Sequence, residues 1–248
     1  MAQHDLRQKP AAPAEHSKSV TILETKDQTP TIRSLRVTKP ASFSFQVSQA
    51  MKLTLDVEEG RDWHILSIAS SQTRDYLEFA IRNSESPFKR AFHLLKPGDE
   101  IRVSGPIGHF FLESDHPGIF ITGGIGITPF KSIIEYATDS GLPTPLTLVY
   151  GNRSPDEVAY KDQLDELAQT NGNLRIVYTV SQPAPELTWD HRVGRIDGDL
   201  LDEVVASGGD AIYYLAGPPS LVFELGQMVA ALGVPPERIR SELFRGYP

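Results

Sequence analysis

Apolar and polar residues alternate along the first part of the chain, over residues 19–112. Such alternation is typical of strands with one buried face and one wet face. Turn-forming pairs, for example Lys39-Pro40 and Pro97-Gly98, separate the segments. The pattern predicts a small antiparallel barrel or sandwich, interrupted by one or two helical turns at residues 87–95. The strands are expected at residues 21–24, 32–37, 51–55, 76–82 and 100–103.

From Gly118 onward the pattern changes to near-continuous apolar runs that are separated by helical stretches. Such runs are typical of parallel strands that are buried on both faces. Strands that alternate with helices predict a doubly wound parallel sheet. We therefore expect two domains that join near residues 113–117. The second has expected strands at 119–122, 146–150, 174–178 and 211–215, and expected helices at 129–138, 160–169, 200–206 and 219–232.

Composition and charge narrow the function classes. Of 248 residues, 40% are hydrophobic and 23% are charged, which is ordinary for a globular chain. The net charge of −8 argues against a nucleic-acid partner. The complete lack of cysteine excludes disulfides, thiolate nucleophiles and Cys-ligated zinc or iron–sulfur clusters within this chain, and no metal site is expected. Residues 1–18 are expected to form a polar, disordered leader without a secretory segment, so we predict a cytoplasmic protein without a membrane span.

The strongest chemical signal follows the strand expected at residues 119–122. Gly123, Gly124 and Gly126 form a glycine turn, and Thr128 and Pro129 open the next helix. Glycines let the backbone approach a ligand, and a helix start offers free N–H groups to a phosphate. A tight turn without a ligand is the alternative, but three glycines before a proline-started helix favour phosphate binding. Pro129 occupies the third position of the ordinary dinucleotide fingerprint, so the motif departs from it.

Weaker signals lie elsewhere. Ser86 before Pro87 is typical of a helix N-cap, and Lys89 and Arg90 add positive charge for a second anion. Taken alone, that segment fits a capped surface helix better. A strand of small hydroxyl residues at 66–71, a second glycine turn at 215–221 and aromatic residues at 242–248 each have an equally simple structural explanation.

Taken together and in order, the segments LSIAS, GGIGITP and LAGPP resemble the ferredoxin–NADP reductase family of flavoprotein reductases. The resemblance covers residues 19–248. It implies an N-terminal six-stranded antiparallel β-barrel that binds FAD, over residues 19–113. It also implies a C-terminal α/β doubly wound parallel-sheet domain that binds NADH or NADPH, over residues 114–248.

The resemblance also implies a flavin site. Ser67 stands where the family places a hydroxyl near the flavin N5, while His64 and Leu66 stand where the family often has Arg and Tyr. Ser48 replaces a usual glycine. Glu242 and Phe244 resemble the family's terminal acid and its stacking aromatic, and with Ser67 they are the expected catalytic residues. The other residues expected to bind FAD, besides His64, Leu66 and Ser67, are Ile68, Ala69, Ser86, Phe88, Lys89 and Arg90.

For the nicotinamide nucleotide, the resemblance implies a pyrophosphate site at the first glycine turn. Ala216 stands where a cysteine is common beside the nicotinamide. Gln182 stands where NADPH users often carry a basic residue, which favours NADH, although Arg153 could serve a 2′-phosphate. The expected residues of this site are Gly123, Gly124, Gly126, Thr128, Arg153, Ser181, Gly217 and Pro218.

The implied function is hydride transfer from NADH or NADPH to FAD, followed by electron transfer to a separate acceptor. Without cysteine the chain cannot carry the cluster itself, so a ferredoxin, a flavodoxin, an oxygenase component or a small oxidant is expected as partner. Two alternatives remain. A free-flavin reductase would use flavin as a substrate, and a degenerate module would bind without catalysis. Four departures from the family pattern favour the latter: Ser48, His64, Leu66 and Ala216.

Overall fold

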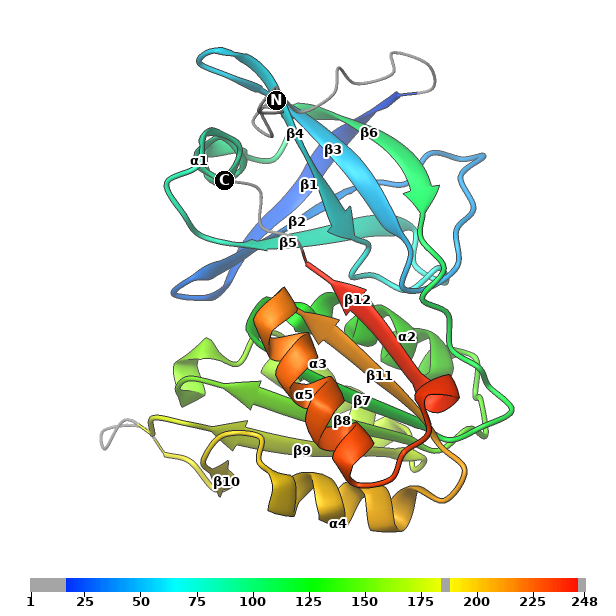
Figure 1. Cartoon of the computed structure of the whole chain (residues 1–248). Coiled ribbons are helices and arrows are strands. Elements are labelled where there is room, and N and C mark those ends of the chain that lie inside the picture. The colour runs from blue at the N-terminus through cyan, green and yellow to red at the C-terminus, as the bar shows by residue number, and fades with distance from the viewer. Residues whose placement is uncertain (1–16, 184–187, 245–248) are drawn as a thin grey trace, which may run out of the picture.

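The computed structural model describes residues 17–183 and 188–244, which form two lobes stacked one above the other (Figure 1). The predicted leader at 1–18 lies outside the described residues apart from its last two positions, and the first strand begins at Lys18. No helix in these ranges is long and apolar enough to cross a membrane.

We call the upper unit the barrel lobe. It contains β1 (Lys18–Thr29), β2 (Ile32–Thr38), β3 (Ala50–Val57), β4 (Gly60–Ser67), β5 (Tyr76–Arg82), α1 (Pro87–Leu94) and β6 (Glu100–Ile107).

The barrel lobe is an antiparallel sheet of six strands in the order β4-β3-β6-β1-β2-β5. Just beyond β4, the Ala69 amide donates to the Glu78 carbonyl of β5, which brings the two edge strands together. The alternating side chains Leu35, Leu53 and Val103 are buried inside, as the sequence pattern predicts. The strands predicted from the alternation and the short helix are confirmed, whereas the strand expected at residues 66–71 is wrong beyond Ser67, where β4 ends. β4 escaped the pattern because its apolar and polar residues do not alternate.

We call the lower unit the α/β lobe, and its sheet is entirely parallel, in the order β10-β9-β8-β7-β11-β12. Helices α2 and α3 pack on one face and α4 and α5 on the other, so the predicted doubly wound sheet is confirmed. β10 and β12 were not predicted. The lobe contains β7 (Gly118–Gly123), η1 (Gly124–Ile127), α2 (Thr128–Asp139), β8 (Leu146–Asn152), η2 (Pro155–Glu157), α3 (Lys161–Thr170), β9 (Leu174–Val180), β10 (Arg192–Val193), α4 (Gly198–Gly208), β11 (Ile212–Gly217), α5 (Pro219–Ala231), η3 (Pro236–Arg238) and β12 (Ile239–Leu243).

The strand order reverses between β7 and β11. The chain moves outward from β7 through β8 to β9, and then returns to place β11 on the other side of β7. In doubly wound sheets, ligands bind in the crevice that such a reversal opens at the carboxyl ends of the strands. Both predicted glycine turns follow carboxyl ends of these strands, the first after β7 and the second after β11.

The glycine turn after β7 is tighter than the sequence suggests. A 3₁₀ turn, η1, comes between β7 and α2, whereas we expected the helix to begin at once. Pro129 lies in the first turn of α2, as predicted. A Cβ atom on Gly126 would clash with the Thr122 Oγ1 and would lie 2.6 Å from the Ala216 carbonyl oxygen. Only glycine therefore lets this turn pack against β11.

A buried ion pair joins the two lobes. The Lys131 Nζ of α2 lies 2.9 Å from the Glu78 Oε2 of β5, and both side chains are 1% exposed. Lys131 also donates to the Ala69 carbonyl. One turn along α2, the Glu135 carboxylate accepts the Ser71 amide at 2.7 Å. These contacts hold α2 against the barrel lobe.

We expect Lys131→Met to lower the free energy of unfolding by about 3 kcal/mol, the lower end for a broken buried pair, because the buried Glu78 carboxylate loses this counterion and keeps only Arg36, whose Nε lies 3.9 Å from the Glu78 Oε1. Urea denaturation followed by circular dichroism measures the change. The matched control is Lys161→Met, which breaks the more exposed Lys161–Asp165 pair and should cost about 1 kcal/mol or less. Equal losses in the two variants would contradict this account.

Candidate functional site

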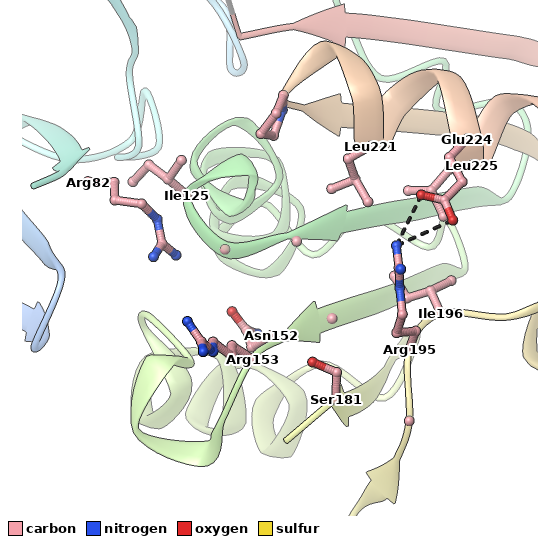
Figure 2. A pocket seen from close by; sticks show the side chains of 15 residues that line it. Arg82, Ile125, Asn152, Arg153, Ser181, Arg195, Ile196, Leu221, Glu224 and Leu225 are labelled. Atoms are coloured by element: carbon pink, nitrogen blue, oxygen red, sulfur yellow. Dashed lines mark hydrogen bonds and ion pairs between the residues drawn. The ribbon is translucent and has the colours of Figure 1, made fainter. Parts of the chain in front are cut away.

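Two cavities adjoin where the lobes meet. The inter-lobe cavity, of about 420 Å³, lies between β4, α1 and β12. The sheet-edge cavity, of about 390 Å³, lies over the carboxyl ends of β7, β8 and β11 (Figure 2). Arg82, Ile125 and Pro218 line both cavities, so a ligand in one can touch a ligand in the other.

The inter-lobe cavity gathers residues from distant parts of the chain. Its walls are largely apolar, with Ser67 on β4 and with Phe244 following β12. The Phe244 amide donates to the Gly217 carbonyl at 2.8 Å, which fixes the segment after β12 beside the second glycine turn. The predicted site residues that line this cavity are His64, Leu66, Ser67, Lys89, Thr128, Pro218, Glu242 and Phe244.

Glu242 brings an unusual carboxyl group to this cavity. Its Oε2 atom is buried and has no hydrogen-bond partner among the described residues. Burial raises the pKa of Glu242 from its ordinary value of 4.5 to about 7. The group is therefore able to give or take a proton near neutral pH.

Positive charge is concentrated at the rim of the same cavity. The pKa of Lys89 is lowered from its usual value, first by burial and then by the positive charge of Arg82. Ser86 lies at the N-cap position of α1, but its side chain makes no capping hydrogen bond, contrary to the usual role of an N-cap serine. The Ser86 Oγ is instead buried without a partner among the described residues. The two adjacent cations, Arg82 and Lys89, are suited to an anion.

His64 occupies the place of the arginine that the family resemblance leads one to expect. Its ring stacks on Phe88 of α1, with ring centroids 4.1 Å apart and ring planes 18° apart. Phe88 is fully buried. His64 thus packs between β4 and α1. The positive charge at the cavity comes from Arg82 and Lys89, which line it.

Several predicted site residues do not line either cavity. Ile68 and Ala69 are fully buried, and Arg90 is exposed and donates to the Glu85 carbonyl. From these positions they can support the residues that line the cavities, but they do not line the cavities themselves. The complete set outside the two linings is Ile68, Ala69, Ser86, Phe88, Arg90, Gly126 and Gly217.

The sheet-edge cavity contains the first glycine turn. Arg153 projects beside it, and its Nε donates to the Gln182 Oε1 at 2.8 Å. Figure 2 shows Arg82 and Ile125 at one end of this cavity and Arg195 with Glu224 at the other. The predicted residues that line it are Gly123, Gly124, Arg153, Ser181 and Pro218.

The sequence patterns missed several cavity residues. Arg82 is the last residue of a predicted strand. A basic residue at a strand end was the one feature of the sequence that could have indicated its place in the site. Arg195 and Glu224 come from separate elements, so local patterns could not pair them. The missed residues that line the sheet-edge cavity include Arg82, Ile125, Asn152, Arg195 and Glu224. The described residues contain no cluster of three or more metal-binding side chains.

Comparison with known proteins finds relatives over most of the chain. Residues 120–224 match the family model described as the oxidoreductase NAD-binding domain. The chain is 30% identical over 232 residues to the ferredoxin–NAD(P)⁺ reductase component of the naphthalene 1,2-dioxygenase system of Pseudomonas putida, over 92% of this chain and 68% of that protein. It is 34% identical over 157 residues to one component of the Na⁺-translocating NADH-quinone reductase of Yersinia pestis, over 61% of this chain and 39% of that protein.

Solved structures share the two-lobed fold. The flavohem-like FAD/NAD-binding domain of nitric oxide dioxygenase from Vibrio cholerae has a TM-score of 0.82 at 20% identity, over 91% of this chain and 98% of that one. A ferredoxin–NADP⁺ reductase from Neisseria gonorrhoeae with bound FAD and NADP has a TM-score of 0.79 at 21% identity, over 92% and 98%.

We expect Glu242→Gln to change how stability depends on pH. Because the folded state raises the pKa of Glu242 to about 7, folding favours the protonated form, and stability falls as pH rises from 4.5 through 7. Between pH 4.5 and pH 8, ligand-free wild type should lose up to about 3 kcal/mol more than the variant. Urea denaturation at several pH values measures this difference. Replacing the exposed Glu59 with Gln should leave the wild-type profile, and an unchanged profile in Glu242→Gln would contradict the assignment.

Proposed function

The chain belongs to the ferredoxin–NADP reductase family, and we propose that it is an FAD-dependent oxidoreductase that uses NADH or NADPH and passes electrons to a separate acceptor. The observation that carries the proposal is the junction of the two cavities at Arg82, Ile125 and Pro218. It lets two large ligands meet, one from each lobe. Hydride transfer between cofactors requires such contact and requires no nucleophilic side chain.

The residues of the inter-lobe cavity fit FAD. Its apolar walls suit a flat ring system, and the buried Glu242 carboxyl offers an unused hydrogen-bonding group. The cationic side chains Arg82 and Lys89, which line this cavity, suit a pyrophosphate. FAD, when bound, supplies a ring that accepts hydride and releases electrons singly or in pairs.

The chain's own groups position ligands and move protons. We assign Ser67 to hydrogen bonding at the reactive edge of the flavin and Phe244 to covering the ring. Glu242 holds or releases a proton close to these two residues, since its pKa of about 7 allows both states. The Gly123-Gly124 turn receives the pyrophosphate of the nicotinamide nucleotide. Residues 19–113 thus form the FAD-binding unit and residues 114–248 the nucleotide-binding unit, although Glu242 and Phe244 of the second unit complete the flavin site.

The acceptor is proposed to be a separate ferredoxin, flavodoxin or oxygenase component, or a small oxidant. The lack of cysteine supports a separate carrier, because this chain cannot ligate an iron–sulfur cluster through thiolates. The Pseudomonas putida relative is named as a reductase component that serves a ferredoxin. That name supports the ferredoxin class.

A second candidate function is NAD(P)H-dependent reduction of free flavin. His64 stacks on Phe88 and stands where an arginine would neutralise the pyrophosphate. One cation fewer favours weaker retention of FAD. In that case flavin would enter and leave the inter-lobe cavity as a substrate.

We expect desalted protein that has been loaded with FAD to remain yellow and to lose the flavin absorption band when NADH is added without oxygen. Retained colour reports tight FAD binding, and bleaching reports hydride transfer. Colourless protein that still catalyses NADH oxidation with added flavin would select the free-flavin reductase. Yellow protein that neither NADH nor NADPH bleaches would refute the oxidoreductase proposal.

We expect Ser67→Ala to slow flavin reduction roughly 10-fold, the equivalent of one lost hydrogen bond. FAD affinity should stay within about 2-fold of wild type, because the pyrophosphate contacts are untouched. Stopped-flow absorbance measures the rate and flavin fluorescence measures the affinity. Ser44→Ala, at an exposed position outside both cavities, is the control. An unchanged reduction rate in Ser67→Ala would remove Ser67 from its proposed role.

A further inference from the structure

One ion pair in the sheet-edge cavity, between Arg195 and Glu224, has no role in the proposed function. The Arg195 Nη2 lies 3.1 and 3.3 Å from the two carboxylate oxygens of Glu224 (Figure 2). Arg195 follows β10, and Glu224 lies on α5. The pair therefore connects two separate walls of the cavity. Its role depends on the proposed binding of a nicotinamide nucleotide at this site.

The arrangement of the cavity indicates which end of that nucleotide the pair would meet. The nicotinamide must lie at the junction with the inter-lobe cavity, beside Ile125 and Pro218, because hydride transfer needs contact with the flavin. The glycine turn follows and receives the pyrophosphate. Figure 2 places Arg195 and Glu224 at the end away from Arg82 and Ile125. An extended dinucleotide would bring its adenosine to that end.

The cationic group at the adenosine end, Arg195, is already engaged, and so is Arg153 nearer the other end. Arg195 is neutralised by the Glu224 carboxylate, and the Arg153 Nε is bound by the Gln182 side chain. NADPH differs from NADH by a 2′-phosphate on the adenosine ribose. An arginine accommodates that phosphate, whereas a carboxylate accepts hydrogen bonds from the ribose hydroxyls and repels the phosphate.

We propose that Glu224 is a specificity-determining residue that selects NADH by withholding Arg195 from a 2′-phosphate. The pair is solvent-exposed, with side chains 71% and 51% exposed, so breaking it costs little. Repulsion adds to this withholding, because the Glu224 carboxylate would remain close to the dianionic phosphate. Removing the charge of Glu224 both frees Arg195 and ends the repulsion.

The test compares four proteins: wild type, Glu224→Gln, the double variant Arg195→Ala/Glu224→Gln, and Glu203→Gln. The last removes an equal charge from another exposed Arg–Glu pair of the α/β lobe that lies outside the cavity linings. Isothermal titration with NADH, NADPH, 5′-AMP and adenosine 2′,5′-bisphosphate measures affinity without any need for turnover. Anaerobic flavin reduction provides the kcat/KM ratio for the two dinucleotides.

We expect wild type and Glu203→Gln to prefer NADH, and Glu224→Gln to shift the preference about 10-fold toward NADPH and toward the bisphosphate. The double variant should keep only the smaller part of that shift, which comes from the lost repulsion, because the phosphate has no arginine to bind. A Glu224→Gln preference equal to that of Glu203→Gln would overturn the inference while leaving the proposed function intact. Wild type that binds neither dinucleotide would overturn both. A shift of the same size in the double variant and in Glu224→Gln would refute the part assigned to Arg195.

Discussion

The buried contact between Lys131 and Glu78 determines how the rest of the site can work. Lys131 belongs to the helix that follows the glycine turn, and Glu78 belongs to the strand that ends at Arg82. Joining them sets the turn beside that strand end, and the two cavities meet there. A charge pair of this kind has little value for stability compared with apolar packing, but it strongly disfavours arrangements in which either charge is left alone. It therefore serves to fix one relative placement of the lobes.

Polar groups in and beside the inter-lobe cavity are not satisfied by the protein alone. Lys89 lies against Arg82 in a half-buried position, and the Ser86 hydroxyl and the Glu242 carboxyl are buried without partners among the described residues. Each arrangement is unfavourable in the ligand-free fold. A ligand that supplies the missing charge and hydrogen bonds recovers that free energy, so binding and folding are coupled. The residues proposed to bind the ligand are therefore those whose polar groups destabilise the ligand-free fold.

The architecture of both lobes could be predicted from the sequence, because the period of apolar residues shows which side chains are buried. Burial in turn determines how strands and helices pack. It did not reveal β4 or β12, whose residues neither alternate nor form long apolar runs. The association of Ser67 with Glu242 came from the family resemblance, since local patterns carry no information on distant contacts. Ser48 shows how a departure is accommodated. It adopts φ +68°, a conformation that favours the family's glycine, and its hydroxyl donates to the Phe110 carbonyl while its amide bonds to the Ser132 Oγ.

The position of β12 has a consequence for biosynthesis. Ser67 is in place once the barrel lobe has folded, but Glu242 and Phe244 are translated about 175 residues later. The ribosome must therefore extend the chain past residue 244, and β12 must pair with β11, before the inter-lobe cavity has all its walls. A nascent barrel lobe would present an open, apolar half-site. The complete inter-lobe cavity therefore exists only after both lobes have folded and docked.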